Sequence, residues 1–214
     1  MTPYYADEAV TLYHGDCREI TEWLAADVQV DPPYGIGLHA DHQPLIAGDN
    51  DTTARDVALA AWGSRPALVF GAWRVARPAS VRQRIVWDKR GGNGYKFGDV
   101  NMPWAEVTEE IYVIGGGWVG RRRPNIIAAP TYNSMARDRP PHPAPKPVAL
   151  MSALIECCPP GVIADPFAGS GSTLVAARNL GRKAIGVEIE ERYCEVIARR
   201  LSQAALPLHA GDPS

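Results

Sequence analysis

Short apolar runs alternate along the chain with stretches in which apolar residues recur every three or four positions. The first of them predict a strand over 10–14, a helix carrying Ile20, Trp23 and Leu24, and a second strand over 28–30. Buried strands that alternate with amphipathic helices are typical of a parallel sheet. The pattern therefore predicts an α/β protein.

The alternation continues toward the C-terminus. Further strands are predicted over 67–70, 84–87, 110–114, 162–164 and 184–187. The helices predicted around them carry apolar residues over 57–62, 148–155, 172–180 and 193–201. Pro147 precedes one of these helices and Gly181 follows another, which are positions where both residue types favour a helix boundary.

Two segments lack such a period. Residues 36–56 carry several Gly, Asp and His residues, which predicts a long mobile loop. Residues 118–147 are rich in Pro and Arg, which predicts a surface segment that sets specificity rather than a domain linker.

Length and composition restrict the class of protein. The 214 residues, 46% of them hydrophobic and 21% charged, suffice for one sizeable core, so a single domain is expected. The absence of a run of roughly 18 apolar residues and of a secretory leader pattern predicts a soluble intracellular protein without membrane contact. The four cysteines form no CxxC pair and lie near no His at zinc-ligand spacing, so we expect reduced thiols and no metal site.

The formal net charge of −2 is not that of a strongly basic nucleic-acid-binding domain. A local patch could still contact phosphates, because five arginines gather in a stretch whose single acid is Asp138. They are Arg121, Arg122, Arg123, Arg137 and Arg139. A solvated loop without a ligand is the alternative interpretation.

The segment from Asp165 to Thr173 is a glycine-rich connection between a predicted strand and a helix, and Glu188 ends the next strand. Glycines let the backbone approach a ligand, the helix N-terminus favours a carboxylate or phosphate, and the distal acid accepts ribose hydroxyls. Leu174 stands where the dinucleotide fingerprint requires its third glycine, which disfavours a NAD site. A turn that merely joins a strand to a helix is the alternative.

The sequence Asp31-Pro32-Pro33-Tyr34 follows a predicted strand, at the end of a parallel sheet where ligands bind. The lone pair of an exocyclic amine on a base is delocalised into the ring, and acceptors for its N–H bonds return electron density to the nitrogen. The Asp31 carboxylate and the Pro32 carbonyl can supply them, and Tyr34 offers a face on which a flipped base can stack. A tight turn without chemistry is the alternative.

Other segments accompany these two motifs in a fixed order. Asp16 and Cys17 end an early strand, and a His-Pro-Ala-Pro-Lys-Pro element over 142–147 precedes a helix. Together with Asp31–Tyr34, the loop from Asp165 and Glu188, they resemble the beta-type group of DNA amino-methyltransferases. The resemblance covers nearly the whole chain.

This resemblance implies a Rossmann-like methyltransferase fold of the α/β class, circularly permuted, with a seven-stranded, mostly parallel sheet and helices on both faces. One domain would span 1–214. Residues 36–56 would form its mobile catalytic-site loop and 118–141 a reduced target-recognition segment. S-adenosylmethionine would be the cofactor, and the catalytic residues would be Asp31, Pro32, Pro33 and Tyr34. The residues implied to bind the cofactor are Asp16, Cys17, Asp31, His142, Lys146, Pro147, Asp165, Pro166, Phe167, Ala168, Gly169, Ser170, Gly171, Thr173, Glu188 and Ile189.

The function implied is methyl transfer to N6 of a flipped adenine in double-stranded DNA, since this family usually carries Asp-Pro-Pro-Tyr in its adenine enzymes. The alternatives are cytosine-N4 transfer, an RNA adenine methyltransferase, and a catalytically silent module that binds cofactor or DNA. A cytosine-C5 enzyme is disfavoured, because Cys157 and Cys158 precede Pro159 rather than follow it. A homodimer, a cytoplasmic, nucleoid-associated protein of bacterial or phage origin and a restriction-modification context are further expectations from the resemblance.

Overall fold

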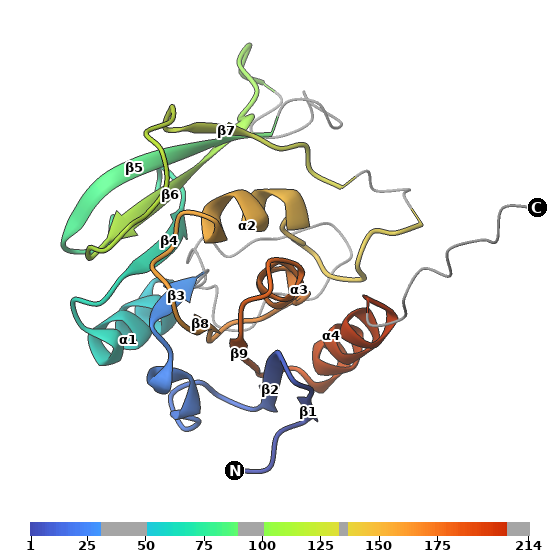
Figure 1. Ribbon diagram of the computed structural model, residues 1–214. Coiled ribbons are helices and arrows are strands. Elements are labelled where there is room, and N and C mark those ends of the chain that lie inside the picture. The colour runs from blue at the N-terminus through green and yellow to red at the C-terminus, as the bar shows by residue number, and fades with distance from the viewer. Residues whose placement is uncertain (31–50, 90–100, 133–136, 205–214) are drawn as a thin grey trace, which may run out of the picture.

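The computed structural model describes residues 1–30, 51–89, 101–132 and 137–204. Their strands form one mixed sheet in the order β1-β2-β9-β8-β3-β4-β6-β5-β7 (Figure 1). Seven strands correspond to predicted ones: β2 (Val10–His14), β3 (Val28–Val30), β4 (Ala67–Gly71), β5 (Val81–Asp88), β6 (Thr108–Ile114), β8 (Ile163–Asp165) and β9 (Ala184–Glu188). Two short strands that the sequence analysis missed, β1 (Tyr5–Ala6) and β7 (Ile126–Ala128), extend the sheet to nine strands.

Strand direction gives the sheet two unlike ends. Strands β2, β9, β8, β3 and β4 pair in parallel, and β6 runs antiparallel to both β4 and β5. Strand β5 therefore points the same way as the parallel strands. We call the end at which these six strands terminate the carboxyl end of the sheet, and the opposite one the amino end. The mostly parallel α/β fold predicted from the sequence is confirmed.

Helices cover both faces of the sheet, as expected. One face packs on α2 (Val148–Ile155), α3 (Ser172–Asn179) and α4 (Glu191–Ala204), and the other on the short 3-10 helix η1 (Glu22–Ala25) and on α1 (Thr53–Trp62) (Figure 1). Alternate side chains of a strand reach opposite faces, so Leu68 and Phe70 join the first core and Ala67 and Val69 the second. This alternation explains why strands buried on both faces are apolar throughout.

Helix α1 corrects two expectations. It begins at Thr53, so the last residues of the loop predicted over 36–56 are helical, and 36–50 lie outside the described residues. Its buried residues are Arg55, Ala58 and Trp62. Val57, one of the apolar residues of the helix predicted over 57–62, is instead 43% exposed. Stacking fixes this rotation, because the Trp62 ring lies 5.7 Å from that of Trp23 on η1.

Two further differences lie elsewhere. The helix expected around Ile20 to Leu24 is a single 3-10 turn, and Ile20 and Trp23 are nevertheless buried beneath the sheet. In the segment 118–141, β7 pairs with β5 in parallel, which the sequence pattern did not indicate. Among the described residues, no helix is long and apolar enough to span a membrane.

Candidate functional site

The candidate site lies at the carboxyl end of the sheet, where β8 and β9 are neighbours. Strand β8 ends at Asp165, and the residues from Asp165 to Gly171, here called the glycine loop, lead directly into α3. Strand β9 ends at Glu188. Because β8 and β9 are parallel and paired, their last residues emerge side by side. The strand and loop positions predicted for this part of the sequence are thus found in the structure.

The Glu188 side chain holds the glycine loop in place. One carboxylate oxygen accepts a hydrogen bond from the Gly169 amide at 2.7 Å, and the other accepts one from the Glu190 amide at 2.8 Å. The carboxyl group is 6% exposed. Burial raises its pKa to about 7, although the two amide hydrogen bonds act in the opposite direction. A buried acid that fixes the loop is therefore available to accept hydroxyl groups of a ligand.

The glycines of the loop allow neighbouring side chains to pack directly against its backbone. Gly169 and Gly171 have φ of 52° and 76°, in the left-handed region. A Cβ atom at Gly169 would lie 3.1 Å from Nε2 of His142, and one at Gly171 would lie 2.8 Å from the Ile197 side chain. The loop therefore packs closely against His142 and α4, and both positions require glycine.

His142 lies against the glycine loop and is neutral. Its ring is 4.6 Å from that of Tyr193, and its Nδ1 accepts a hydrogen bond from the Ala144 amide at 3.2 Å. Burial, followed by the positive charge of Lys146, lowers the pKa of His142 to about 3. Arg139 donates hydrogen bonds to the carbonyls of His142 and Pro143, at 3.0 and 3.2 Å. The imidazole is thus a fixed uncharged wall of the site.

The remaining residues predicted to bind the cofactor surround the same loop. Asp165 is 1% exposed and accepts a hydrogen bond from the Phe167 amide at 3.1 Å. Lys146 lies with Nζ 5.0 Å from the Phe70 ring centre, and Pro147 forms the N-cap of α2. The other positions form or flank the loop and its strands: Pro166, Ala168, Ser170, Thr173 and Ile189.

Asp16 and Cys17 follow β2, which pairs with β9 so that His14 faces Glu188. Asp16 accepts hydrogen bonds from the Arg18 amide and guanidinium, which lower its pKa. Cys17 is buried, and burial raises the pKa of its thiol to about 12, so it remains protonated. The structure brings both residues to the edge of the site, with Asp16 already paired.

Arg200 is a residue of the site that the sequence analysis missed. Its guanidinium donates to the Ser170 carbonyl and, at 3.4 Å, to the Ser172 hydroxyl. A hydrogen bond with Tyr132 ties it also to the segment after β7. Arg200 follows Tyr193 by seven positions on α4, so both lie on one face of the helix. That spacing is the signal that could have indicated it.

The motif Asp31-Pro32-Pro33-Tyr34, which the sequence analysis predicts to be catalytic, lies outside the described residues. Strand β3, which ends at Val30, lies between β8 and β4 in the sheet. Its pairing with β8 brings Val28 opposite Ile163 and Gln29 opposite Ala164. The chain therefore leaves the described part of β3 directly beside the strand that opens the glycine loop.

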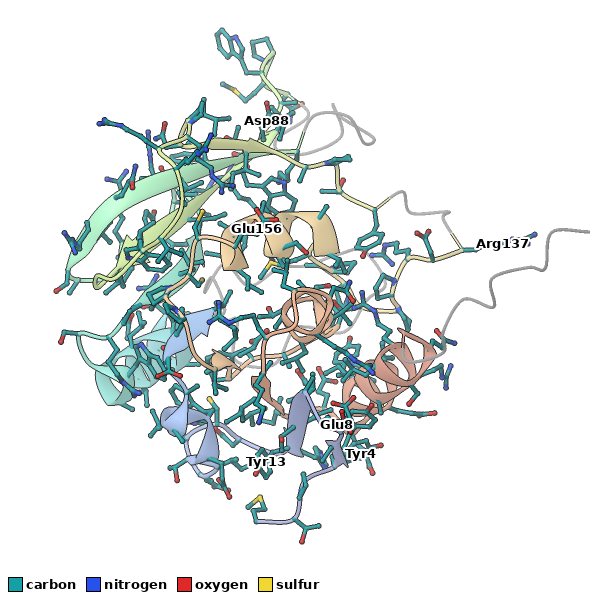
Figure 2. All side chains as sticks on the ribbon, in the orientation of Figure 1. Tyr4, Glu8, Tyr13, Asp88, Arg137 and Glu156 are labelled. Atoms are coloured by element: carbon teal, nitrogen blue, oxygen red, sulfur yellow. The ribbon has the colours of Figure 1, made fainter. Side chains whose placement is uncertain are left out.

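The five arginines divide between the two ends of the molecule. Arg121, Arg122 and Arg123 line a cleft of about 880 Å³ with residues of β5, β6 and α2. This cleft lies toward the amino end, because β6 ends there and the Val119 amide bonds to the Cys157 carbonyl just after α2. Arg137 and Arg139 lie instead in the segment leading to His142, and Figure 2 shows Arg137 projecting away from the ribbon.

Within the described residues, no group of three or more His, Cys, Asp or Glu side chains could hold a metal ion. The four cysteines are free, and Cys17, Cys158 and Cys194 are buried. The described groups around the glycine loop are buried carboxylates, backbone amides and a neutral imidazole. Such groups suit an organic ligand with hydroxyl, amino and carboxylate groups.

Comparison with known proteins adds a family model, described as DNA methylase for N6 and N4 methyltransferases, that matches residues 77–199. The type II methyltransferase M.ScaI of Streptomyces caespitosus is 26% identical over 96% of this chain and 86% of its own length. The DNA adenine methyltransferase YhdJ of Escherichia coli K12 is 24% identical over 94% of this chain and 85% of its own.

Two solved structures share the fold. The complex of M1.HpyAVI with S-adenosylmethionine has a TM-score of 0.61 at 22% identity, covering 89% of this chain and 99% of that one. The cytosine-N4-specific PvuII DNA methyltransferase has a TM-score of 0.68 at 16% identity, covering 97% and 90%. At these identities the likeness establishes the fold alone.

The buried Glu188 carboxyl predicts a pH dependence of stability. Its pKa is raised from 4.5 in the unfolded chain to about 7 in the folded one. The unfolded state therefore ionises first, and the Glu188 contribution to the free energy of unfolding is lost as the pH rises from 4.5 to about 7. The loss should be on the order of a few kcal/mol, since each pKa unit corresponds to about 1.4 kcal/mol.

Glu188→Gln removes this dependence because an amide does not titrate. Urea unfolding of both proteins between pH 4.5 and 8 measures it. We expect the stability of the wild type relative to the variant to fall up to about pH 7 and then level off. Parallel pH profiles of the two proteins would contradict the assignment.

Proposed function

Because this chain belongs to the DNA methylase family, whose model matches residues 77–199, we propose that it methylates N6 of an adenine in double-stranded DNA. The family as such comprises methyltransferases that act on adenine N6 or cytosine N4 of DNA. The choice of adenine is carried by one observation. The motif after β3 begins with Asp31, which in the family usually accompanies adenine, whereas Ser in that place usually accompanies cytosine.

S-adenosylmethionine is the methyl donor of this family, as the sequence analysis predicted. The described residues fit it. The backbone of the glycine loop, the buried Glu188 and the adjacent Asp165 provide amide and carboxylate groups that match the polar groups of that cofactor. When bound, the cofactor supplies an electrophilic methyl group on a sulfonium.

We assign the cofactor groups to residues as follows. Glu188 accepts the ribose hydroxyls, because its two oxygens are held at the end of β9 by amide hydrogen bonds. Asp165 lies near the amino group, and the loop amides together with Thr173 hold the carboxylate at the start of α3. Asp16 accepts from the adenine amino group, which requires that it share its carboxylate with Arg18.

The chemistry at the target base falls to Asp31 and its neighbours. The Asp31 carboxylate and the Pro32 carbonyl accept the two N–H bonds of the exocyclic amine, which returns electron density to nitrogen. Nitrogen then forms the new N–C bond as the S–C bond breaks, and one amine proton leaves through the Asp31 carboxylate to solvent. Pro33 stiffens the loop and Tyr34 stacks on the flipped base.

Cytosine-N4 transfer is the second candidate. It is supported by the family model, which covers N4 as well as N6 methyltransferases. The amine chemistry is the same for both bases, so the fold and the cofactor site do not distinguish them. RNA adenine methylation, a silent binding module, a homodimer and a restriction-modification context stay predictions.

Asp31→Ala tests the proposal. The assay combines purified protein, tritiated S-adenosylmethionine and mixed-sequence duplex DNA. The variant should transfer methyl groups about a thousandfold more slowly than the wild type, or slower still, because it loses an acceptor aimed at developing charge. Cofactor binding by the variant should fall only modestly. Mass spectrometry of the nucleosides should find N6-methyladenine.

Other outcomes separate the alternatives. N4-methylcytosine would replace the adenine assignment with the second candidate, and transfer to RNA but not DNA would replace the substrate. Retained turnover in Asp31→Ala would remove Asp31 from the chemistry. Cofactor binding without transfer to any nucleic acid would indicate a silent module.

We propose that Arg137 contacts DNA phosphates and that Arg121, Arg122 and Arg123 contribute less than their sequence suggests. Arg137 is exposed and lies in the segment that reaches the glycine loop, whereas the other three lie toward the amino end. A duplex that presents its target base at the carboxyl end would have to extend back along β5 beyond Arg84, which lies beside Asn125, to reach them. Arg139 is engaged with backbone carbonyls and acts chiefly on the loop.

The salt dependence of DNA affinity tests this division. Each lost phosphate contact reduces the slope of log K against log salt by about 1. We expect Arg137→Ala to reduce it by about that amount and the triple Ala variant of Arg121 to Arg123 to leave it nearly unchanged. A larger change in the triple variant would restore those residues as the DNA contact.

A further inference from the structure

A strongly exposed apolar tip projects from the carboxyl end of the sheet. It belongs to the connection between β5 and β6, where Trp104 is 76% exposed and Met102 is 55% exposed. Figure 1 shows this connection reaching beyond β5 and β6, and in Figure 2 it rises above Asp88. Large apolar side chains exposed together in this way usually mark a contact surface.

A second exposed tryptophan is tied to this tip. Trp73 follows β4, is 69% exposed, and donates from its indole nitrogen to Glu106 at 3.3 Å. Glu106 also pairs with Arg74, whose guanidinium carbon lies 5.0 Å from the centre of the Trp73 ring. The two loops that carry exposed tryptophans are thus held together through Glu106, two residues after Trp104.

The tip lies at the end of the sheet where the site is. Strands β4 and β5 both terminate at the carboxyl end, and β4 is the direct neighbour of β3. With neighbouring strands about 4.8 Å apart, β4, β6 and β5 lie roughly 5 to 15 Å sideways from β3. The register places Asp88 and Thr108 about five residues, or roughly 16 Å, farther along the strands than Val30, so the tip projects past the end of β3. A duplex stacks its base pairs at 3.4 Å, so the sideways span corresponds to about one to four base pairs.

The charges around the tip decide which part of DNA it fits. Arg74 pairs with Glu106, and Lys89 pairs with Glu109 at 3.1 Å, so these cations are neutralised within the protein. Among the described residues, the cations beside the tip are thus paired with carboxylates. An indole and a thioether suit the faces of bases, and apolar side chains inserted between base steps open a duplex.

We propose that Met102 and Trp104 form a wedge that contacts the base stack beside the target base and stabilises the opened duplex, with Trp73 and Glu106 bracing the loop. The inference rests on the proposed function, because it assumes that the target base enters at this end of the sheet. It adds residues that the family motifs do not include. The contact is apolar and hence separable from phosphate binding.

Trp104→Ala tests the wedge by fluorescence anisotropy on a labelled mixed-sequence duplex. Its affinity should fall about tenfold, as expected for one lost base–aromatic stack, while the slope of log K against log salt stays unchanged. Trp104→Phe should recover most of the affinity because it keeps a ring. Val119→Ala, at an apolar residue 46% exposed toward the amino end, is the matched control and should bind as the wild type.

A second readout follows duplex opening. On a duplex with 2-aminopurine in place of the methylated base, the wild type should raise fluorescence and Trp104→Ala should lose most of that rise, with cofactor affinity and melting temperature unchanged. Unchanged DNA affinity in both Trp104→Ala and Met102→Ala would overturn the wedge, as would a shift to a smaller oligomer in these variants. If the wild type transfers no methyl group but Trp104→Ala still loses DNA affinity tenfold, the proposed function would be wrong and the wedge would stand.

Discussion

The Glu188 carboxylate, held between the amides of Gly169 and Glu190, is the interaction on which the site depends. It joins the end of β9 to the glycine loop after β8, two segments that are 19 residues apart in sequence. A carboxylate with 6% exposure carries a desolvation cost, which its amide donors offset only in part, as the raised pKa indicates. A buried acid with a raised pKa beside a loop at the carboxyl end of the sheet is a candidate for ligand binding.

Because of the direction of the strands, the two ends of the sheet carry different groups. Strands β2, β8, β4 and β5 all terminate at the carboxyl end, so Asp16, the glycine loop and the two tryptophan-bearing loops share that end. The arginine-lined cleft lies toward the other. Arg200 links the parts on the site's side, since it contacts the glycine loop and Tyr132 in the segment after β7.

Much of this arrangement could be predicted from the sequence. The seven main strands, α2 and α3 follow from apolar period and from Pro and Gly at helix boundaries, because these signals are local. The glycine loop and Glu188 could be found because close backbone approach and ribose binding demand particular residue types at a set spacing. The structure places Asp165, His142 and Glu188 around this loop, as the order of motifs implied.

The features that could not be predicted from the sequence depend on contacts between distant segments. The buried face of α1 depends on stacking between Trp62 and Trp23, which no pattern within α1 encodes. Strand β7 is short, and its extended conformation depends on pairing with β5 rather than on an apolar pattern of its own. The positive charge of Arg121 to Arg123 was evident from the sequence. The end of the sheet near which these residues lie depends on the direction of β6.

The most direct test of the account is calorimetric titration of S-adenosylmethionine into the wild-type protein and Glu188→Ala, with thermal unfolding of both as a check on folding. Two hydrogen bonds to a charged group should contribute at least about 1.5 kcal/mol, so the variant should bind about tenfold more weakly or worse. Equal affinity in two well-folded proteins would contradict the claim that this end of the sheet is the cofactor site.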